Sequence, residues 1–241
     1  MNRLISKYHC LFILLLIVIL SMKETQSYAQ QEQEYYKSPV NWGVKVGLNA
    51  LSTTVYEIYY NDIEVPNGSY TNKNGYMVSA FLRINLDHFF MQPEASWNYY
   101  RQECSFTKPI EGTENSYYPA TSLKINSSSA NINILAGYHI VKNGPYIFNF
   151  YAGASVKSVY QTDFTTRTDY HYTSKDMQYN ITGILGFSMN IAKLHFDVRY
   201  ELSQSDTNLE LSKIPDFPED YHGLLIKKNE NILSFSCGVM F

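Results

Sequence analysis

Apolar residues recur at every second position in eight segments of the chain. In the first segment, Trp42, Val44 and Val46 alternate with Gly43 and Lys45. Side chains of a strand point alternately to opposite faces, so this period predicts strands with one apolar and one polar face. The eight predicted strands span residues 42–50, 75–85, 89–99, 129–139, 146–157, 177–188, 194–203 and 233–241.

The links between the predicted strands alternate in length. The short links are residues 86–88, 141–145 and 191–193. The long links are residues 55–73, 103–122, 159–176 and 204–229. Barrels of the bacterial outer membrane have short periplasmic turns and long outer loops. The pattern therefore predicts an all-β fold, an eight-stranded antiparallel transmembrane β-barrel with both termini on the periplasmic side.

Period two does not tell which face of a barrel is outside, because soluble barrels of the lipocalin type alternate equally well. Three features favour the membrane. The last strand ends in phase on Phe241, the polar face holds many small residues, and aromatic residues gather at strand ends. The expected interfacial girdles comprise Trp42, Phe89, Tyr138 and Tyr146 at one end, and Trp97, Tyr99, Tyr100, Tyr160 and Tyr200 at the other.

The N-terminal residues predict a cleaved secretory signal. Arg3 and Lys7 precede the apolar run from Leu11 to Leu20, which has signal length but is short for a membrane helix. Ser27-Tyr28-Ala29 supplies small residues at a cleavage site; an uncleaved anchor is the alternative. The predicted parts are a signal peptide (1–29), a periplasmic lead-in (30–41) and the barrel (42–241).

The charge of the mature chain excludes an electrostatic footprint for nucleic acid. After cleavage, 16 of the 19 basic and 21 of the 22 acidic residues remain. No later apolar run approaches the roughly 20 residues of a membrane helix. We expect Cys104 at the outer rim and Cys237 on the lipid face of the last strand. The third and eighth predicted strands are not neighbours, so we expect two free thiols.

The polar face of the predicted strands carries charges that would be enclosed in a narrow lumen. Enclosed charges must be paired, so we expect Glu94 to face Lys45 or Arg83. We expect Arg199 to lie between Asp197 and Glu201. A polar pathway or a small-ligand site is the open alternative. The predicted lumenal polar network comprises Lys45, Arg83, Glu94, Lys157, His195, Asp197, Arg199 and Glu201.

No cofactor or metal is expected. His195 and Asp197 lie two apart on one strand face and could supply two metal ligands, but a site needs three or four. At the other end of the chain, Phe235, Val239 and Phe241 form the expected C-terminal assembly signal, which the barrel-assembly machinery would read.

Several segments resemble strands of the PorT-like outer-membrane β-barrel family of Gram-negative bacteria. They are Gly43-Val44-Lys45-Val46-Gly47-Leu48-Asn49, Phe90-Met91-Gln92-Pro93-Glu94, Ile132-Asn133-Ile134-Leu135-Ala136-Gly137-Tyr138, Tyr146 to Val156, and Asp197-Val198-Arg199-Tyr200. Asn133 departs from the family, which usually has proline there. The resemblance implies an outer-membrane barrel, and it implies little about activity, because only a few members serve as accessory parts of protein secretion.

These observations predict an outer-membrane protein with a structural or binding role, centred on tyrosine-rich outer loops. Accessory work in protein secretion is one form of that role. We expect no enzyme activity. The alternatives are a narrow pore and a lipid hydrolase or acyltransferase, for which His171 and His222 would be the loop histidines. The expected partners are outer-membrane lipid, the barrel-assembly machinery and an envelope or secretion protein, and not nucleic acid.

Overall fold

The computed structural model describes nine ranges of the chain. They are residues 38–60, 63–64, 69–107, 121–143, 145–166, 171–174, 177–204, 207–210 and 224–241. The predicted signal peptide lies outside them. Within these ranges, no helix has the length and apolar character needed to cross a membrane.

All regular structure in the described ranges is β-strand. The strands are β1 (Val40–Tyr60), β2 (Ile63–Glu64), β3 (Ser69–Leu86), β4 (Phe89–Phe106), β5 (Thr121–Asn143), β6 (Tyr146–Thr166), β7 (His171–Ser174), β8 (Gln178–Ile191), β9 (Leu194–Ser203), β10 (Thr207–Glu210) and β11 (Leu224–Met240).

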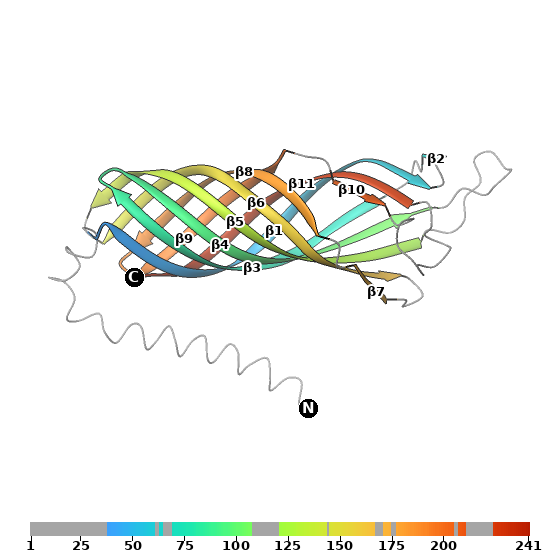
Figure 1. The fold of residues 1–241 in the computed structure, drawn as a ribbon, viewed down its shortest axis with the longest axis horizontal. Helices are drawn as coiled ribbons and strands as arrows, with labels where there is room; N and C mark the ends of the chain where they lie inside the picture. Colours follow the sequence, from blue (N-terminus) through green and yellow to red (C-terminus); the bar gives the residue numbers. More distant parts are fainter. Residues whose placement is uncertain are drawn as a thin grey trace, which may run out of the picture.

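Eight of these strands close into an antiparallel barrel, in the order β11-β9-β8-β6-β5-β4-β3-β1, with β1 paired back to β11 (Figure 1). The predicted fold class is confirmed. Strand β1 begins at Val40, two residues before the predicted start. Tight turns at Asp87-His88 and Ala192-Lys193 fall where short links were predicted. In the third short link, Gly144 lies outside the described residues.

One half of the barrel, from the tight turns to about Asn49 of β1, is here called the barrel body. Along the strands of the barrel body, apolar side chains that point outward alternate with polar side chains that point inward. In β1, Trp42 and Val44 are 55% and 44% exposed, whereas Asn41 and Lys45 are buried. The outward residues of the eight strands form a continuous apolar band, as a lipid-facing surface requires.

Small residues of the lumen make room for aromatic rings. The ring of Phe90 lies against Gly137 and that of Tyr151 against Gly186, so close that a Cβ at either glycine would overlap the ring. Phe90, Tyr151, Leu135 and Ile184 form a buried cluster. The barrel body is therefore filled by side chains, as expected for eight strands.

Beyond the barrel body the strands continue into a two-sheet sandwich, which the sequence analysis did not predict. Strand β1 pairs with β3 only as far as Asn49, and β8 and β9 end near Gln178 and Ser203. The closed wall thus divides into one sheet, β10-β11-β1-β2, and a second, β3-β4-β5-β6-β7. In Figure 1, β2, β10 and β11 lie along the upper side of this end and β7 along the lower side.

The sandwich has an apolar interior to which both sheets contribute. Leu51, Tyr100 and Ile232 form a cluster across the two sheets. The further buried apolar side chains are Ile58, Cys104, Phe106, Leu123, Ile125, Phe164 and Ile226. Tyr100 points inward, so its predicted place in the aromatic girdle is wrong. The long links predicted at 55–73, 103–122, 159–176 and 204–229 are also wrong in part, because their flanks are strand.

Candidate functional site: an ion network inside the barrel

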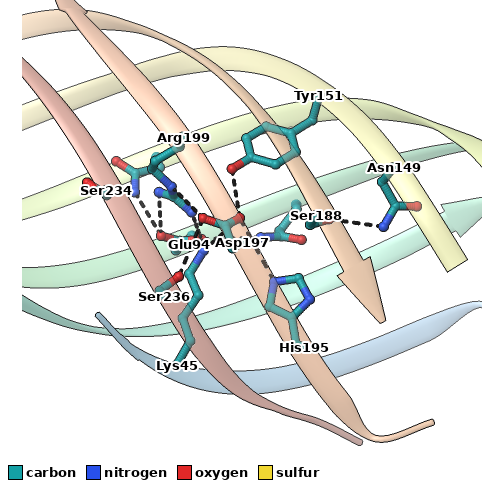
Figure 2. Close-up of polar contacts among 12 residues, drawn as sticks. Lys45, Glu94, Asn149, Tyr151, Ser188, His195, Asp197, Arg199, Ser234 and Ser236 are labelled. Carbon is teal, nitrogen blue, oxygen red and sulfur yellow. Dashed lines mark hydrogen bonds and ion pairs between the residues drawn. The ribbon is translucent and has the colours of Figure 1, made fainter. Parts of the chain in front are cut away.

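Four charged side chains meet in the middle of the barrel body: Lys45 of β1, Glu94 of β4, and Asp197 and Arg199 of β9 (Figure 2). Each side chain is at most 1% exposed. All four project from the strand positions that alternate with the apolar band. The period of the strands therefore brings two cations and two carboxylates into one enclosed space.

Arg199 is the centre of the network. Its Nη1 and Nη2 donate to the two oxygens of Glu94 at 2.8 and 3.0 Å, and its Nε donates to Asp197 Oδ1 at 3.0 Å. Lys45 Nζ lies 2.9 Å from Glu94 Oε2 and 3.4 Å from Asp197 Oδ2. Every charge has two partners of opposite sign, which offsets the cost of burial.

Neutral groups complete the shell of the two carboxylates. The hydroxyl of Tyr151 donates to Asp197 Oδ2 at 2.7 Å, and Asn133 Nδ2 donates to Glu94 Oε1 at 3.1 Å. Figure 2 shows Tyr151, His195 and Arg199 converging on Asp197. The polar Asn133, which departs from the PorT-like pattern, thus has a contact in the network.

The structure agrees with one of the expected pairings and changes the other. Glu94 pairs with Lys45, one of its two predicted partners. The other, Arg83, hydrogen-bonds instead to Gln92, whose Oε1 accepts from Arg83 Nε and Nη2 at 2.9 and 2.7 Å. Arg199 takes Glu94, across the lumen, as its second carboxylate in place of Glu201. Glu201 is buried beside this site.

His195 is fully buried, and its Nδ1 lies 2.6 Å from Asn190 Oδ1, while its Nε2 is 4.0 Å from Asp197. Across the described part of the chain, no group of three or more His, Cys, Asp or Glu side chains could hold a metal ion. The geometry is that of a member of the polar network.

A second ion cluster lies inside the sandwich, between the layer of Leu51 and Ile232 and that of Ile58 and Ile226; of its members, only Lys157 was expected from the sequence. Lys157 Nζ is 3.6 Å from Glu230, and Lys228 Nζ is 2.6 Å from the same carboxylate. Lys228 also donates to Gln102 Oε1 and to the Tyr70 hydroxyl, both at 2.9 Å. Lys228 fell in the predicted 204–229 loop, and the lengthened β11 is what turns it inward.

The cavity found at the turn end of the lumen is small. Its volume is about 10 Å³ and its lining includes Asn41, Arg83, His139 and Asn190. That volume is roughly one water-sized sphere. Neither it nor the ion network leaves room for a substrate in this part of the lumen.

The remaining predicted residues are dispersed. Phe235 of β11 and Phe241, directly after this strand, are exposed, and the Phe241 ring stacks on Trp42 with centroids 4.7 Å apart. Their role as an assembly signal stays a prediction. His171 lies on β7, and its Nδ1 is 3.0 Å from Thr165 Oγ1. His222 is outside the described residues. Cys237 is exposed on the band, whereas Cys104 is buried inside the sandwich, not at the rim as expected.

A family model described as an outer membrane protein beta-barrel domain matches residues 28–207. The chain belongs to this family. It is an eight-stranded barrel of the cell outer membrane, as predicted, with the apolar band facing lipid. The narrower PorT-like resemblance stays a prediction. None of the curated proteins matches the sequence at a significant level.

Solved barrels resemble the structure at low sequence identity. Ail of Yersinia pestis, in complex with the heparin analogue sucrose octasulfate, has 11% identity and a TM-score of 0.42, covering 84% of this chain and 99% of Ail. OprG of Pseudomonas aeruginosa has 10% identity and a TM-score of 0.47, covering 83% of this chain and 95% of OprG. Neisserial surface protein A has 11% identity and a TM-score of 0.37, covering 85% of this chain and 98% of that protein. At these TM-scores the likenesses indicate no ligand for this chain.

Proposed function

We propose that this protein is a non-conducting structural and binding protein of the outer membrane. The observation that carries the proposal is the ion network of Lys45, Glu94, Asp197 and Arg199, which lies across the lumen with every member buried and paired. A solute path through these groups would have to break bidentate, charge-assisted hydrogen bonds.

The sandwich supports the binding half of the proposal. It extends the strands past the lipid band on a packed apolar core, and so holds its connecting segments on a rigid base. Because barrels of this kind keep their short turns in the periplasm, the sandwich faces the cell exterior. Described tyrosines of this part include Tyr59 on β1 and Tyr172 on β7, and tyrosine is favoured at binding surfaces.

We further propose that the partner is a protein of the cell envelope, with the chain acting as an accessory of a protein-secretion complex. The reason for naming secretion is the PorT-like resemblance of the strands. A lumen without a path fits an accessory better than a channel.

The first test is in-cell crosslinking followed by copurification from mildly solubilised outer membranes, with an affinity tag inserted between Asn67 and Gly68. These two residues lie outside the described ranges. A stoichiometric envelope protein is the expected result, and its loss without crosslinker marks a weak complex. A monomer recovered alone from crosslinked cells would remove the accessory role.

The second test is planar-bilayer conductance of the purified barrel. The expected record is silent, because the lumen is filled by paired charges. A steady single-channel current in the unaltered protein would overturn the non-conducting part of the proposal and leave the partner question open to the crosslinking result.

A further inference from the structure

Two cations face each other on the outside of the barrel, just past the apolar band. Lys73 of β3 and Arg101 of β4 are directly opposite in the strand register. Like charges in this position repel and destabilise a strand pair. The two positive charges attract an anion to the space between them, so the arrangement points to an anion as ligand.

The charge at Arg101 meets only a neutral acceptor in its hydrogen bonds. Arg101 is exposed, and its Nε and Nη2 donate to the carbonyl oxygen of Asn74 at 3.2 and 2.8 Å. Lys73 pairs with Glu103 at 2.8 Å, and this hydrogen bond lowers the pKa of Glu103 below its usual value. A third cation, Lys124 of β5, stands opposite Glu103 in register. Lys73 and Lys124 thus share this carboxylate, whereas Arg101 hydrogen-bonds to a backbone carbonyl.

Aromatic side chains lie directly below the cations, at the edge of the band. Tyr76 stacks on Tyr99 with centroids 4.9 Å apart and lies 6.0 Å from the ring of Trp97. Trp97 Nε1 donates to the Tyr160 hydroxyl at 2.7 Å. Tyrosine and tryptophan take this position at the interface between lipid tails and head groups. The cations therefore stand at the depth of the head groups.

The patch is confined to one side of the barrel. On β1 and β11 the first outward side chains past the band are Ser52 and Asn231, and on β9 the chain continues into Gln204. These are uncharged. Among the described residues of these strands, β3 and β4 each place a cation immediately beyond their interfacial aromatic residues.

We propose that Lys73 and Arg101, with Tyr76, Tyr99 and Trp97 beneath them, bind the phosphate of a phosphorylated glycolipid in the leaflet that borders the sandwich. A phosphate between the two cations would relieve their repulsion and accept charge-assisted hydrogen bonds from the guanidinium. The rings beneath it would contact the sugar and upper acyl chains. The proposal uses the membrane location and the orientation argued above, and does not depend on a protein partner.

The test is native mass spectrometry of the detergent-solubilised barrel titrated with lipid A, and with the same lipid after removal of its phosphate groups. The unaltered protein should prefer the phosphorylated lipid about tenfold, the effect of one charge-assisted hydrogen bond. The Lys73→Gln/Arg101→Gln variant should lose that preference, and Arg101→Lys should keep part of it, because lysine keeps the charge without the planar fork.

The matched control is Lys142→Gln/Lys193→Gln, which removes two exposed cations at the opposite, turn end of the barrel. It should bind as the unaltered protein does. An equal loss in both double variants would reduce the effect to net charge and overturn the site. Displacement of the lipid by millimolar inorganic phosphate would reassign the patch to a free anion, and absence of any phosphate preference would remove it.

Discussion

The barrel body and the sandwich are built by the same strands with opposite polarity. In β5, Ile132 and Ile134 of the barrel body face outward, with Asn131 and Asn133 inside. Further along the same strand, in the sandwich, Leu123 and Ile125 are buried and Lys124 is exposed. The strand keeps its phase, and only the residue types exchange places.

This comparison shows that the surroundings, and not the strand, decide which face is apolar. In the barrel body lipid lies outside, so apolar residues point out and the interior must pair its charges. In the sandwich the outside is polar, so the ordinary rule of an apolar interior returns. Charge pairing thus fills the barrel body, whereas the sandwich combines burial of apolar surface with the second ion cluster.

The largest expected effect comes from breaking the charge pairing. Glu94→Gln leaves Lys45 and Arg199 with Asp197 alone, and an uncompensated buried charge costs about 3–5 kcal/mol. Urea unfolding in lipid vesicles, followed by tryptophan fluorescence, measures the loss. The variant should unfold at a lower urea concentration and still show no conductance in a planar bilayer.

Glu57→Gln is the matched control, because Glu57 pairs with Lys227 at 2.8 Å on a half-exposed surface of the sandwich. A solvent-exposed pair of that kind contributes little to stability. Equal destabilisation by the two substitutions would contradict the special role of the enclosed network. An ion current in Glu94→Gln would show that the network is a gate and not a filling.

The next effect tests burial in the sandwich. Leu123→Ala removes a fully buried side chain and should cost about 2–4 kcal/mol, confined to the sandwich. Protease digestion should cut the sandwich strands of the variant first, while the barrel body keeps its folded mobility on an unheated SDS gel. Lys124→Ala, one position away and exposed, should leave both readouts unchanged. If the barrel body lost its folded mobility as well, the two regions would unfold as one unit.

A smaller effect, of opposite sign, is expected at a tight turn of the barrel body. Ala192 has a φ of 52°, in the left-handed region that strains a residue with a Cβ. Ala192→Gly should therefore raise the free energy of unfolding by about 1 kcal/mol. Asp87, with a φ of 58°, is the comparison: aspartate tolerates this region, so Asp87→Gly should gain less. Protease sensitivity of the sandwich should not change in either variant.

The smallest effect is a pH dependence confined to the sandwich. The hydrogen bond from Lys227 lowers the pKa of Glu57 below its usual value. A group whose folded pKa is lowered stabilises the fold above its ordinary pKa and loses that contribution as pH falls through the folded value. Protease resistance of the strand ends should decline below about pH 4.5 in the unaltered protein. Glu57→Gln should show a flatter profile, and identical profiles would remove the linkage.

Most of the barrel body could be predicted from the sequence, because its signal is a sustained period of two with one consistent polarity. That period also placed Lys45, Glu94, Asp197 and Arg199 on the inward face. The pairing of Glu94 with Arg199 could not be predicted, since β4 and β9 are not neighbours. Which residues meet across the lumen depends on the stagger of all strands between them.

The sandwich escaped prediction for a different reason. Register shifts interrupt β1 between Val55 and Glu57 and β3 between Lys73 and Tyr76. A third shift leaves Tyr160 of β6 without an opposite residue on β5. Each interruption reverses the side on which later residues point. Combined with the reversed polarity, these shifts hide the period, and the segments look like polar, tyrosine-rich loops.

The pairing of β1 with β11 has a consequence for how the protein is made. The side chains of Asn49 and Ser234 that bond across this seam are 185 residues apart in sequence. Contacts this distant form late, since the entropy of closing so long a loop must be overcome first. The cylinder thus stays open, with the free edge of β1 unprotected, until the final strand has been translated and exported. Closure of the barrel therefore competes with aggregation. A chaperone that covers the edge of β1 during that interval would raise the yield of folded protein.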